Sequence, residues 1–300
     1  YPKTEPVVPF QSGKTVSVAP GEGALFNAVK AAKAGDILSL SAGDYTAGKF
    51  IRIDKPLTIK ANGDVNLSFE RSTLFEIMDG GSLQIVGLDI SGKDAPDYKG
   101  NSVIRTQPYA MLQNYRLEIL NSNFTDLDIN QSFNVVSAAK GTFADNMLVE
   151  NSNFDTVSGA IFKLDTESDD YGIYNAEYLT IKNSNFSNVE GALVDYYRGG
   201  TDESTFGPHF DMTNSTLTNV GRGKKNKSKA SIHLHGVQVT NISSNSFKDS
   251  EPFLVTHTVS EPKTKIFENT FVQTAAPRVV ELNSGLEPTA IITNNEGLNP

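Results

Sequence analysis

A short sequence recurs along this chain at a nearly constant interval. Asn-Ser-Asn-Phe occurs at residues 121–124, 151–154 and 183–186, and weaker copies end at residues 217, 247 and 271. The final apolar residues of the six copies are therefore 30, 32, 31, 30 and 24 residues apart. Self-similarity at this period is typical of solenoids, in which each repeat buries its apolar face only against its neighbours.

The residues around each copy indicate the kind of solenoid. Five positions before each final apolar residue there is another: Ile119, Val149, Ile181, Met212, Ile242 and Ile266. Short β-branched segments with Asn or Ser between them suit short strands joined by turns. The fixed leucines of leucine-rich repeats and the long amphipathic runs of helical repeats are absent. We predict an all-β fold, a single-stranded right-handed parallel β-helix. Phe124, Phe154, Phe186 and Phe247 should stack in its interior, and asparagines should form a hydrogen-bonded ladder along a bend.

The N-terminal part of the chain departs from the repeat. Residues 1–18 are rich in Pro, Lys and Ser, which predicts an extended arm or linker. Residues 24–34 place Leu25, Phe26 and Val29 on one apolar face, and Gly35 follows. We predict a helix there that covers the first coil, because open terminal strands pair with other molecules. Residues 19–300 would then form one β-helix domain.

Composition and charge narrow the function classes. The 300 residues carry a formal net charge of −9, which argues against general nucleic-acid binding. No apolar run approaches the length of a membrane span, so no membrane contact is expected. Cysteine is absent, which excludes disulfides and thiolate metal sites, and a secreted bacterial β-helix needs neither. The chain begins at Tyr1 without an initiator Met or a signal segment. We therefore expect a mature or excised piece of a longer product, secreted or periplasmic.

Two insertions interrupt the regular repeats, and solenoid insertions often form the binding face. The first, residues 195–209, holds Tyr197, Arg198, two glycines and an acidic pair. One interpretation is a plain turn in which Arg198 forms a salt bridge with Asp202 and Glu203. The other is a substrate-binding loop, in which Arg198 offers a carboxylate two parallel hydrogen bonds.

The second insertion is the basic loop, residues 221–229. It concentrates five cations within eight residues of an acidic protein: Arg222, Lys224, Lys225, Lys227 and Lys229. Such a run is often only a solvated loop. The functional interpretation is a clamp that binds an anionic chain and weakens as salt rises.

Histidines in the second strand of the repeat provide a third signal. His233 and His235 are two residues apart and should share a face, and counting from the repeats aligns His235 with His257 and Tyr196. A buried, mutually hydrogen-bonded pair of histidines is one interpretation. The other is a functional face that carries Lys163, Tyr197, Arg198, His233 and His257, with His235 and Tyr196 facing outward instead if the strands slip by one residue. No ligand set for a metal is identifiable.

Three segments together resemble a known family. Residues 35–45 and the Pro-Leu-Thr-Ile of residues 56–59 resemble the opening of right-handed β-helix polysaccharide lyases. Residues 197–208, 234–238 and 257–259 resemble the C-terminal β-helix module of family-six polysaccharide lyases, which include alginate lyases and chondroitinase B. The catalytic β-helix of that family carries Lys-Ser near Arg-His-Gly and a calcium ion. Here Arg-His-Gly is absent and Lys-Ser occurs only at residues 227–228, so Ca²⁺ is implied by the family alone.

The resemblance implies an anionic, alginate-like polysaccharide as partner. One hypothesis is a lyase that performs β-elimination, with Arg198 or Lys163 neutralising the uronate and His257, His235 or Tyr197 exchanging protons. A second is a non-catalytic module that binds polysaccharide or packs against a catalytic β-helix of the same chain. A β-helical adhesin or scaffold is a third. A glycoside hydrolase is a fourth, and its paired carboxylates would come from Asp165, Glu167, Asp195 or Asp202.

Overall fold

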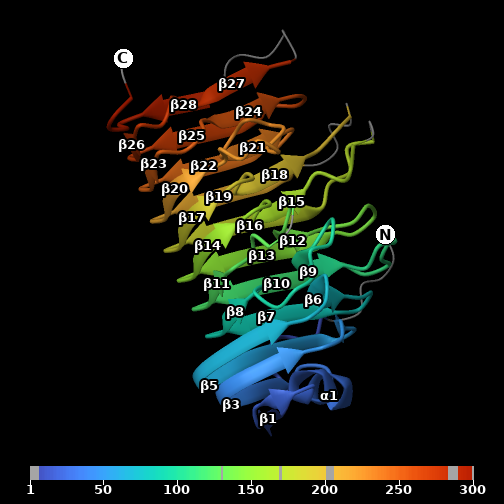
Figure 1. Ribbon diagram of the computed structural model, residues 1–300. Helices are drawn as coiled ribbons and strands as arrows, with labels where there is room; N and C mark the ends of the chain where they lie inside the picture. The colour runs from blue at the N-terminus through green and yellow to red at the C-terminus, as the bar shows by residue number, and fades with distance from the viewer. Residues whose placement is uncertain (1–6, 130, 169–170, 201–205, 283–289, 299–300) are drawn as a thin grey trace.

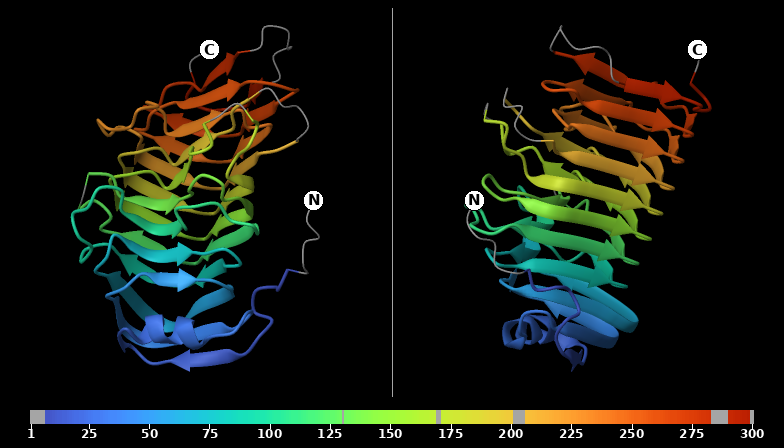
Figure 2. Two further views of the ribbon diagram at one scale, coloured as in Figure 1. Left: turned by 90° about the vertical axis from the view of Figure 1, so that its right-hand side faces the viewer. Right: turned by 180° about the vertical axis from the view of Figure 1, so that it is seen from behind.

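Parallel strands stacked along one axis form the body of the protein (Figures 1 and 2). The computed structural model describes residues 7–129, 131–168, 171–200, 206–282 and 290–298. Within these ranges the strands form one 19-stranded and one 9-stranded sheet, and every strand pairing is parallel. The arrangement is consistent with the predicted parallel β-helix. Among the described residues, no helix is long and apolar enough to cross a membrane.

The smaller sheet takes one strand from each coil. Its strands are β4 (Ile51–Ile53), β6 (Thr73–Ile77), β9 (Ser102–Thr106), β12 (Asn134–Ser137), β15 (Phe162–Leu164), β18 (Val194–Tyr197), β21 (Ile232–His235), β24 (Phe253–His257) and β27 (Arg278–Glu281). From β6 onward, each strand pairs with its equivalent in the next coil, three strands further along the chain, and β4 pairs with β6. Residues one repeat apart in the sequence therefore become neighbours.

The larger sheet takes two strands from each regular coil, on either side of a bend. Its members are β1 (Thr15–Val18), β2 (Gly21–Glu22), β3 (Ile37–Ala47), β5 (Pro56–Phe69), β7 (Ser82–Val86), β8 (Asp89–Ser91), β10 (Tyr115–Leu120), β11 (Asn123–Thr125), β13 (Ala144–Glu150), β14 (Asn153–Val157), β16 (Ala176–Lys182), β17 (Asn185–Val189), β19 (His209–Thr213), β20 (Thr216–Val220), β22 (Val239–Ser243), β23 (Ser246–Lys248), β25 (Lys263–Phe267), β26 (Thr270–Val272) and β28 (Ala290–Thr293). Strands before the bend pair with each other from coil to coil, and so do those after it.

Asparagine makes the bend in four successive repeats. Asn121, Asn151, Asn183 and Asn214 have φ between 49° and 51°, in the left-handed region that Asn tolerates better than other side chains. Two residues on, the predicted ladder is confirmed: Asn185 Nδ2 donates to Asn153 Oδ1, and Asn153 Nδ2 donates to Asn123 Oδ1, both at 2.8 Å. In the repeated Asn-Ser-Asn, the first asparagine therefore makes the bend and the second forms the hydrogen bonds that join the coils.

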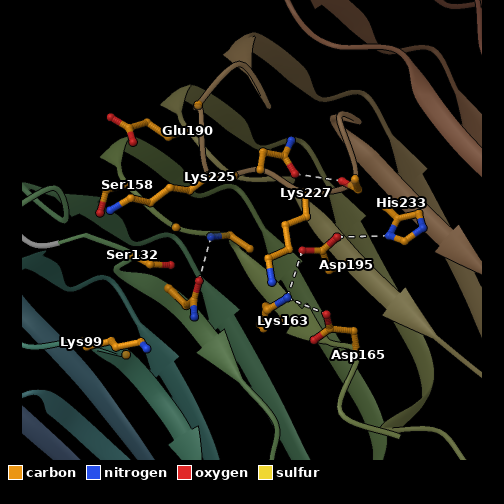
Figure 3. A pocket seen from close by; sticks show the side chains of 18 residues that line it. Lys99, Ser132, Ser158, Lys163, Asp165, Glu190, Asp195, Lys225, Lys227 and His233 are labelled. Atoms are coloured by element: carbon orange, nitrogen blue, oxygen red, sulfur yellow. Dashed lines mark hydrogen bonds and ion pairs between the residues drawn. The ribbon is translucent and has the colours of Figure 1, made fainter. Parts of the chain in front are cut away.

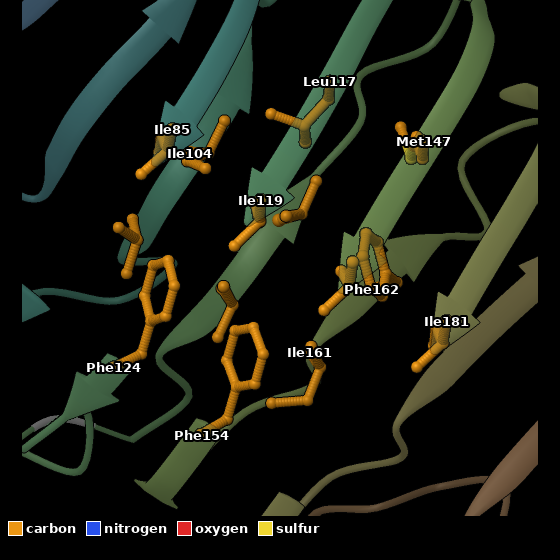
Figure 4. Close-up of a cluster of buried hydrophobic side chains, with 14 of the residues drawn as sticks. Ile85, Ile104, Leu117, Ile119, Phe124, Met147, Phe154, Ile161, Phe162 and Ile181 are labelled. Atoms are coloured by element: carbon orange, nitrogen blue, oxygen red, sulfur yellow. The ribbon is translucent and has the colours of Figure 1, made fainter. Parts of the chain in front are cut away.

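Phenylalanine rings fill the interior behind this bend, as predicted. Phe124 and Phe154 stack with centroids 4.7 Å apart (Figure 4). Phe154 and Phe186 stack at 4.9 Å. Leu217 takes the next place in the column, and Phe247 follows it. All of them are buried. The shared register of the coils is therefore fixed by a continuous apolar column.

The N-terminal end differs from the prediction in detail. Helix α1 spans Ala24–Ala31, shorter than the predicted 24–34, because Ala32 already has extended backbone angles. Leu25 and Val29 are buried, and the helix contacts β1, β3 and β4. Thr15–Val18, which fell within the predicted arm, forms β1 and pairs with β3. Tyr1 to Pro6 lie outside the described residues.

Candidate functional site

The smaller sheet presents one outward column of polar side chains. Its register aligns Ser137, Lys163, Asp195 and His233, one residue from each of four successive strands. The residues that flank Lys163 and Asp195 along their strands are buried, because side chains alternate between the two faces of a strand. Equivalent positions in successive repeats are thereby collected on one face, about 4.8 Å apart from strand to strand.

Lys163 is held by two carboxylates within this column. Its Nζ lies 2.6 Å from Oδ2 of Asp165 and 3.3 Å from Oδ2 of Asp195. The other oxygen of Asp195, Oδ1, lies 3.3 Å from Nδ1 of His233. Asp195 therefore joins an ammonium group and an imidazole, and with Nδ1 protonated it leaves the lone pair of the His233 ring on Nε2.

These contacts set the protonation states of the column. Burial alone would lower the pKa of Lys163, but the Asp195 and Asp165 carboxylates outweigh it and leave the pKa raised. Burial alone would raise the pKa of Asp195, but the His233 hydrogen bond and the charge of Lys163 leave it lowered. At neutral pH Lys163 is therefore a cation and Asp195 an anion.

The effect of Asp195 on stability should depend on pH. Its pKa is lower in the folded protein, so its contribution is present above the ordinary Asp pKa of about 3.9 and is lost as the pH falls through the lowered value. We expect Asp195→Asn to be less stable than wild type near pH 7, and the difference to shrink below about pH 4. Urea unfolding across this range measures it. Asp64→Asn, at an exposed position, is the control and should show no such change; a gap that stays constant with pH would contradict the prediction.

The basic loop lies above this column and is firmly anchored. Asn226, which is buried, donates from Nδ2 to the carbonyl oxygens of Gly221 at 2.7 Å and Ala230 at 2.9 Å. Lys225 Nζ donates to the carbonyl oxygen of Gln131 at 3.3 Å, in the connection between β11 and β12. The loop thus folds back across neighbouring coils, and its five cations remain exposed. A buried amide fixes the loop while its charges stay available.

A cleft of about 670 Å³ separates the basic loop from the strand column. We call it the lysine cleft, because its lining includes Lys99, Lys163, Lys225 and Lys227, together with the carboxylates of Asp165, Glu190 and Asp195 and the imidazole of His233. Figure 3 shows Lys227 reaching from the loop toward Lys163 and Asp195. The cleft therefore combines four cations with one imidazole and three carboxylates.

Six of the residues named from the sequence meet in the lysine cleft. They are Lys163, His233, Lys225 and Lys227, together with Asp165 and Asp195 from the glycoside hydrolase hypothesis. Arg222, Lys224 and Lys229 belong to the same loop but do not line this cleft. The basic loop and the second strands, two separate signals in the sequence, thus contribute to one site.

Arg198 and His257 do not lie on the outer face, and their predicted placement is wrong. Arg198 is 1% exposed, and its guanidinium lies 6.0 Å from the Tyr174 ring. His257 is fully buried, with Nδ1 2.6 Å from Glu281 Oε1 and Nε2 2.8 Å from Thr264 Oγ1. Each follows an outward position by three residues, which turns it inward. Asp202 and Glu203, the other half of the predicted salt bridge to Arg198, lie outside the described residues.

Tyr197 and His235 face outward but lie apart from the cleft. Their rings stack with centroids 4.4 Å apart. Burial lowers the pKa of His235, and the charge of His233 lowers it further. His235 pairs with Tyr197 and Thr256, so the predicted alignment of His235 with His257 and Tyr196 is off by one residue. Tyr196 is buried.

Sequence reasoning missed Lys99, Ser132 and Glu190 as parts of the site. Lys99 lies in the connection between β8 and β9, and Ser132 in the one between β11 and β12. The connection around Lys99 is rich in Pro, Gly and charges, which is the signal that could have included it. In the part of the chain that the structure describes, no three His, Asp or Glu side chains are grouped so as to hold a metal ion.

Comparisons with known proteins find similar solved structures but no matching family model or curated protein. No protein-family model and no curated protein matches the chain. Among solved structures, the PL6 family alginate lyase AlyGC is 46% identical, with a TM-score of 0.95, over 100% of this chain and 41% of that one. A point mutant of that enzyme matches with 46% identity and a TM-score of 0.96 over the same shares.

A more distant solved structure shares the fold. An alginate lyase from Paenibacillus sp. str. FPU-7 is 17% identical, with a TM-score of 0.57 over 96% of this chain and 99% of that one. The matches confirm the resemblance to β-helix polysaccharide lyases of the PL6 type. The chain spans about two-fifths of the AlyGC chain, at 41% of its length.

Proposed function

We propose that this chain is a β-helix of a PL6-type alginate lyase and that its lysine cleft binds a uronic-acid polysaccharide. The similarity to AlyGC over the whole chain supports the enzyme class. We further propose a right-handed coil over residues 19–300, with α1 covering its N-terminal end, as the C-terminal module of a longer secreted or periplasmic bacterial protein. A catalytic β-helix of the same chain would be its partner.

The observation that carries the proposal is the gathering of cations in the cleft of an acidic protein. Lys99, Lys225 and Lys227 line the cleft as exposed side chains, in a chain whose net charge is −9. Of the four lysines, Lys163 is the one that carboxylates of the described residues, Asp165 and Asp195, already neutralise. A uronate polymer carries one carboxylate on each sugar, so several ammonium groups along one cleft match it. Such binding is electrostatic and weakens as salt rises.

The Asp195–His233 pair favours catalysis as the more specific form of this proposal. In β-elimination the proton on C5 passes to His233 Nε2, and the electrons of that C–H bond form the C4–C5 double bond. The C4–O bond breaks, and the leaving oxygen takes a proton from the imidazolium or from water. Lys227 and Lys163 would stabilise the charge that develops on the carboxylate.

The non-catalytic module remains the second candidate, and one contact favours it. Lys163 already binds two carboxylates, so a substrate carboxylate must compete with Asp165 and Asp195 for it. The glycoside hydrolase hypothesis is disfavoured, because that chemistry needs one carboxylic acid with a raised pKa. The pKa of Asp195 is lowered instead, and the Glu167 side chain is buried and accepts a hydrogen bond from the Gly141 amide.

The deciding experiment measures binding and cleavage separately. The chain is incubated with alginate, chondroitin or pectate, with and without calcium, and the absorbance of unsaturated uronate is followed. Retention on an alginate gel is measured in parallel. Retention with rising absorbance supports a lyase, and retention without it supports the binding module. No retention and no absorbance with any polymer would overturn the proposal.

A positive charge inside the lysine cleft should contribute more to alginate affinity than an equal charge outside it. Lys227→Ser should reduce alginate affinity by up to about fivefold at low salt, since an exposed ion pair contributes about 0.2–1 kcal/mol. Lys229→Ser removes an equal charge from the same loop but outside the lysine cleft, and should change affinity less. Titration calorimetry of both variants provides the comparison. Equal losses would mean that net charge, and not the cleft, governs binding.

A further inference from the structure

A second cleft lies on the other side of the basic loop. Its volume is about 560 Å³. Arg222, Lys224 and Lys225 line it, opposite turn residues of neighbouring coils. The basic loop therefore forms a ridge between two clefts and divides its cations between them. Lys227 lines only the lysine cleft, Arg222 and Lys224 line only the second cleft, and Lys225 lines both.

The charge of the second cleft also suits an anion. Its three cations face two carboxylates, those of Asp128 and Glu190. The two carboxylates and the three cations are all exposed, so none of these charges is buried. The local balance is therefore positive, although the chain as a whole is acidic. Exposed cations of this kind attract a polyanion in a salt-dependent way.

Amide groups on the wall of the second cleft suit a sugar rather than a bare charge. Asn188 and Asn219 line the cleft from equivalent turns of successive coils, where both have positive φ, 53° and 55°. Asn219 Nδ2 donates to Asn188 Oδ1 at 3.0 Å, which fixes both side chains. The Asn219 amide oxygen has no hydrogen-bond partner among the described residues, and it offers an acceptor to a hydroxyl group.

The two clefts meet beneath the ridge at Gly223. Glu190, Gly223 and Lys225 line both of them. The Gly223 amide donates to the Glu190 carbonyl oxygen at 2.9 Å. A side chain at Gly223 would bring its Cβ within 2.6 Å of Glu190 Cβ, so only glycine lets the loop approach the coil this closely. With Asn226 anchoring the other side, the ridge holds its cations in place for both clefts.

We propose that the second cleft is an additional subsite for the same uronate polysaccharide, and that one polymer contacts both clefts around Lys225. This inference rests on the proposed function of the lysine cleft. Thr156, Asn188 and Asn219 come from three successive coils, and they span about 10 Å, the length of roughly two sugars. A two- or three-sugar fragment fits one cleft, whereas a polymer can occupy both and gain affinity from the second contact.

The test compares short and long ligands on matched variants. Arg222→Ser/Lys224→Ser removes the two cations that line only the second cleft and leaves the lysine cleft intact. Lys227→Ser removes one cation that lines only the lysine cleft and leaves the second cleft intact. Lys229→Ser/Lys248→Ser removes two exposed charges that line neither cleft, and serves as the control. Calorimetry measures each protein with uronate trisaccharides and with alginate polymer, and melting curves verify that each variant folds.

We expect the Arg222→Ser/Lys224→Ser protein to bind polymer about tenfold more weakly and trisaccharide nearly as tightly as wild type, because only the polymer reaches the second cleft. Lys227→Ser should weaken both ligands, and the control should change neither appreciably. Unchanged polymer affinity in the Arg222→Ser/Lys224→Ser protein, with a loss in Lys227→Ser, would overturn this inference alone. An equal loss of affinity for trisaccharide and polymer in the Arg222→Ser/Lys224→Ser protein would also overturn it, since the two clefts would then act as one continuous site. Wild-type protein that binds no polymer would instead overturn the proposed function.

Discussion

Phe154→Ala should lower the free energy of unfolding by about 3–5 kcal/mol, the cost typical of truncating a buried Phe. Phe154 lies in the middle of the stacked column, with Phe124 at 4.7 Å on one side and Phe186 at 4.9 Å on the other. Its side chain is 1% exposed, so the cavity would be enclosed. Each coil contacts only its neighbours, and the loss therefore falls on the interfaces between three coils.

Urea unfolding followed by circular dichroism measures this change. Phe154→Leu is the matched control, because Leu217 already occupies the same column two coils further on, next to Phe186. It should cost less than about 1.5 kcal/mol, as expected for a hydrophobic replacement that the site accommodates. If Phe154→Ala and Phe154→Leu destabilise equally, the stacked column does not hold these coils together in the way described.

Replacing all five cations of the basic loop with Ser should reduce alginate affinity by between about fourfold and several hundredfold at low salt. Four of them line a cleft: Arg222, Lys224, Lys225 and Lys227. Each exposed ion pair contributes about 0.2–1 kcal/mol, and about 1.4 kcal/mol corresponds to a tenfold change in affinity. The residual binding should depend less on salt, because Lys99 is then the exposed cation that remains in the lysine cleft.

Affinity electrophoresis in alginate at several salt concentrations measures both effects. Replacing the four lysines of the loop with Arg keeps the charge and provides the control, which should retain the affinity and the salt dependence. The buried anchor Asn226 is untouched in both proteins, so the loop should keep its shape. Unchanged retention of the Ser variant would show that the basic loop is not the binding element.

Alternation along the strands explains which site residues could be predicted. Lys163 and His233 occupy equivalent outward positions of equivalent strands, so the repeat alone places them together. The same alternation, applied strictly, turns Arg198 and His257 inward, each three residues after an outward position. Placing Arg198 beside Tyr197 on one face ignored that rule.

The loops were harder to place, because their paths follow no period. Lys99 comes from a connection more than one hundred residues before the basic loop, yet both line the lysine cleft. The return of Lys225 to the Gln131 carbonyl depends on the buried Asn226 and on the close approach of Gly223. Each of these is a tertiary contact with no counterpart in the repeat.

The amino-acid sequence by itself determined the stacked β architecture, the interior Phe column and the Asn bend of this protein. These features follow from contacts between equivalent residues of neighbouring repeats. Because residues one repeat apart in the sequence become neighbours in space, the repeat predicts those contacts directly. Only the tertiary structure decided that Asp195 joins Lys163 to His233 and that the basic loop separates two clefts. Those arrangements depend on how far each side chain reaches and on how an irregular loop folds over the coils. The spacing of the sequence repeats predicts neither of them.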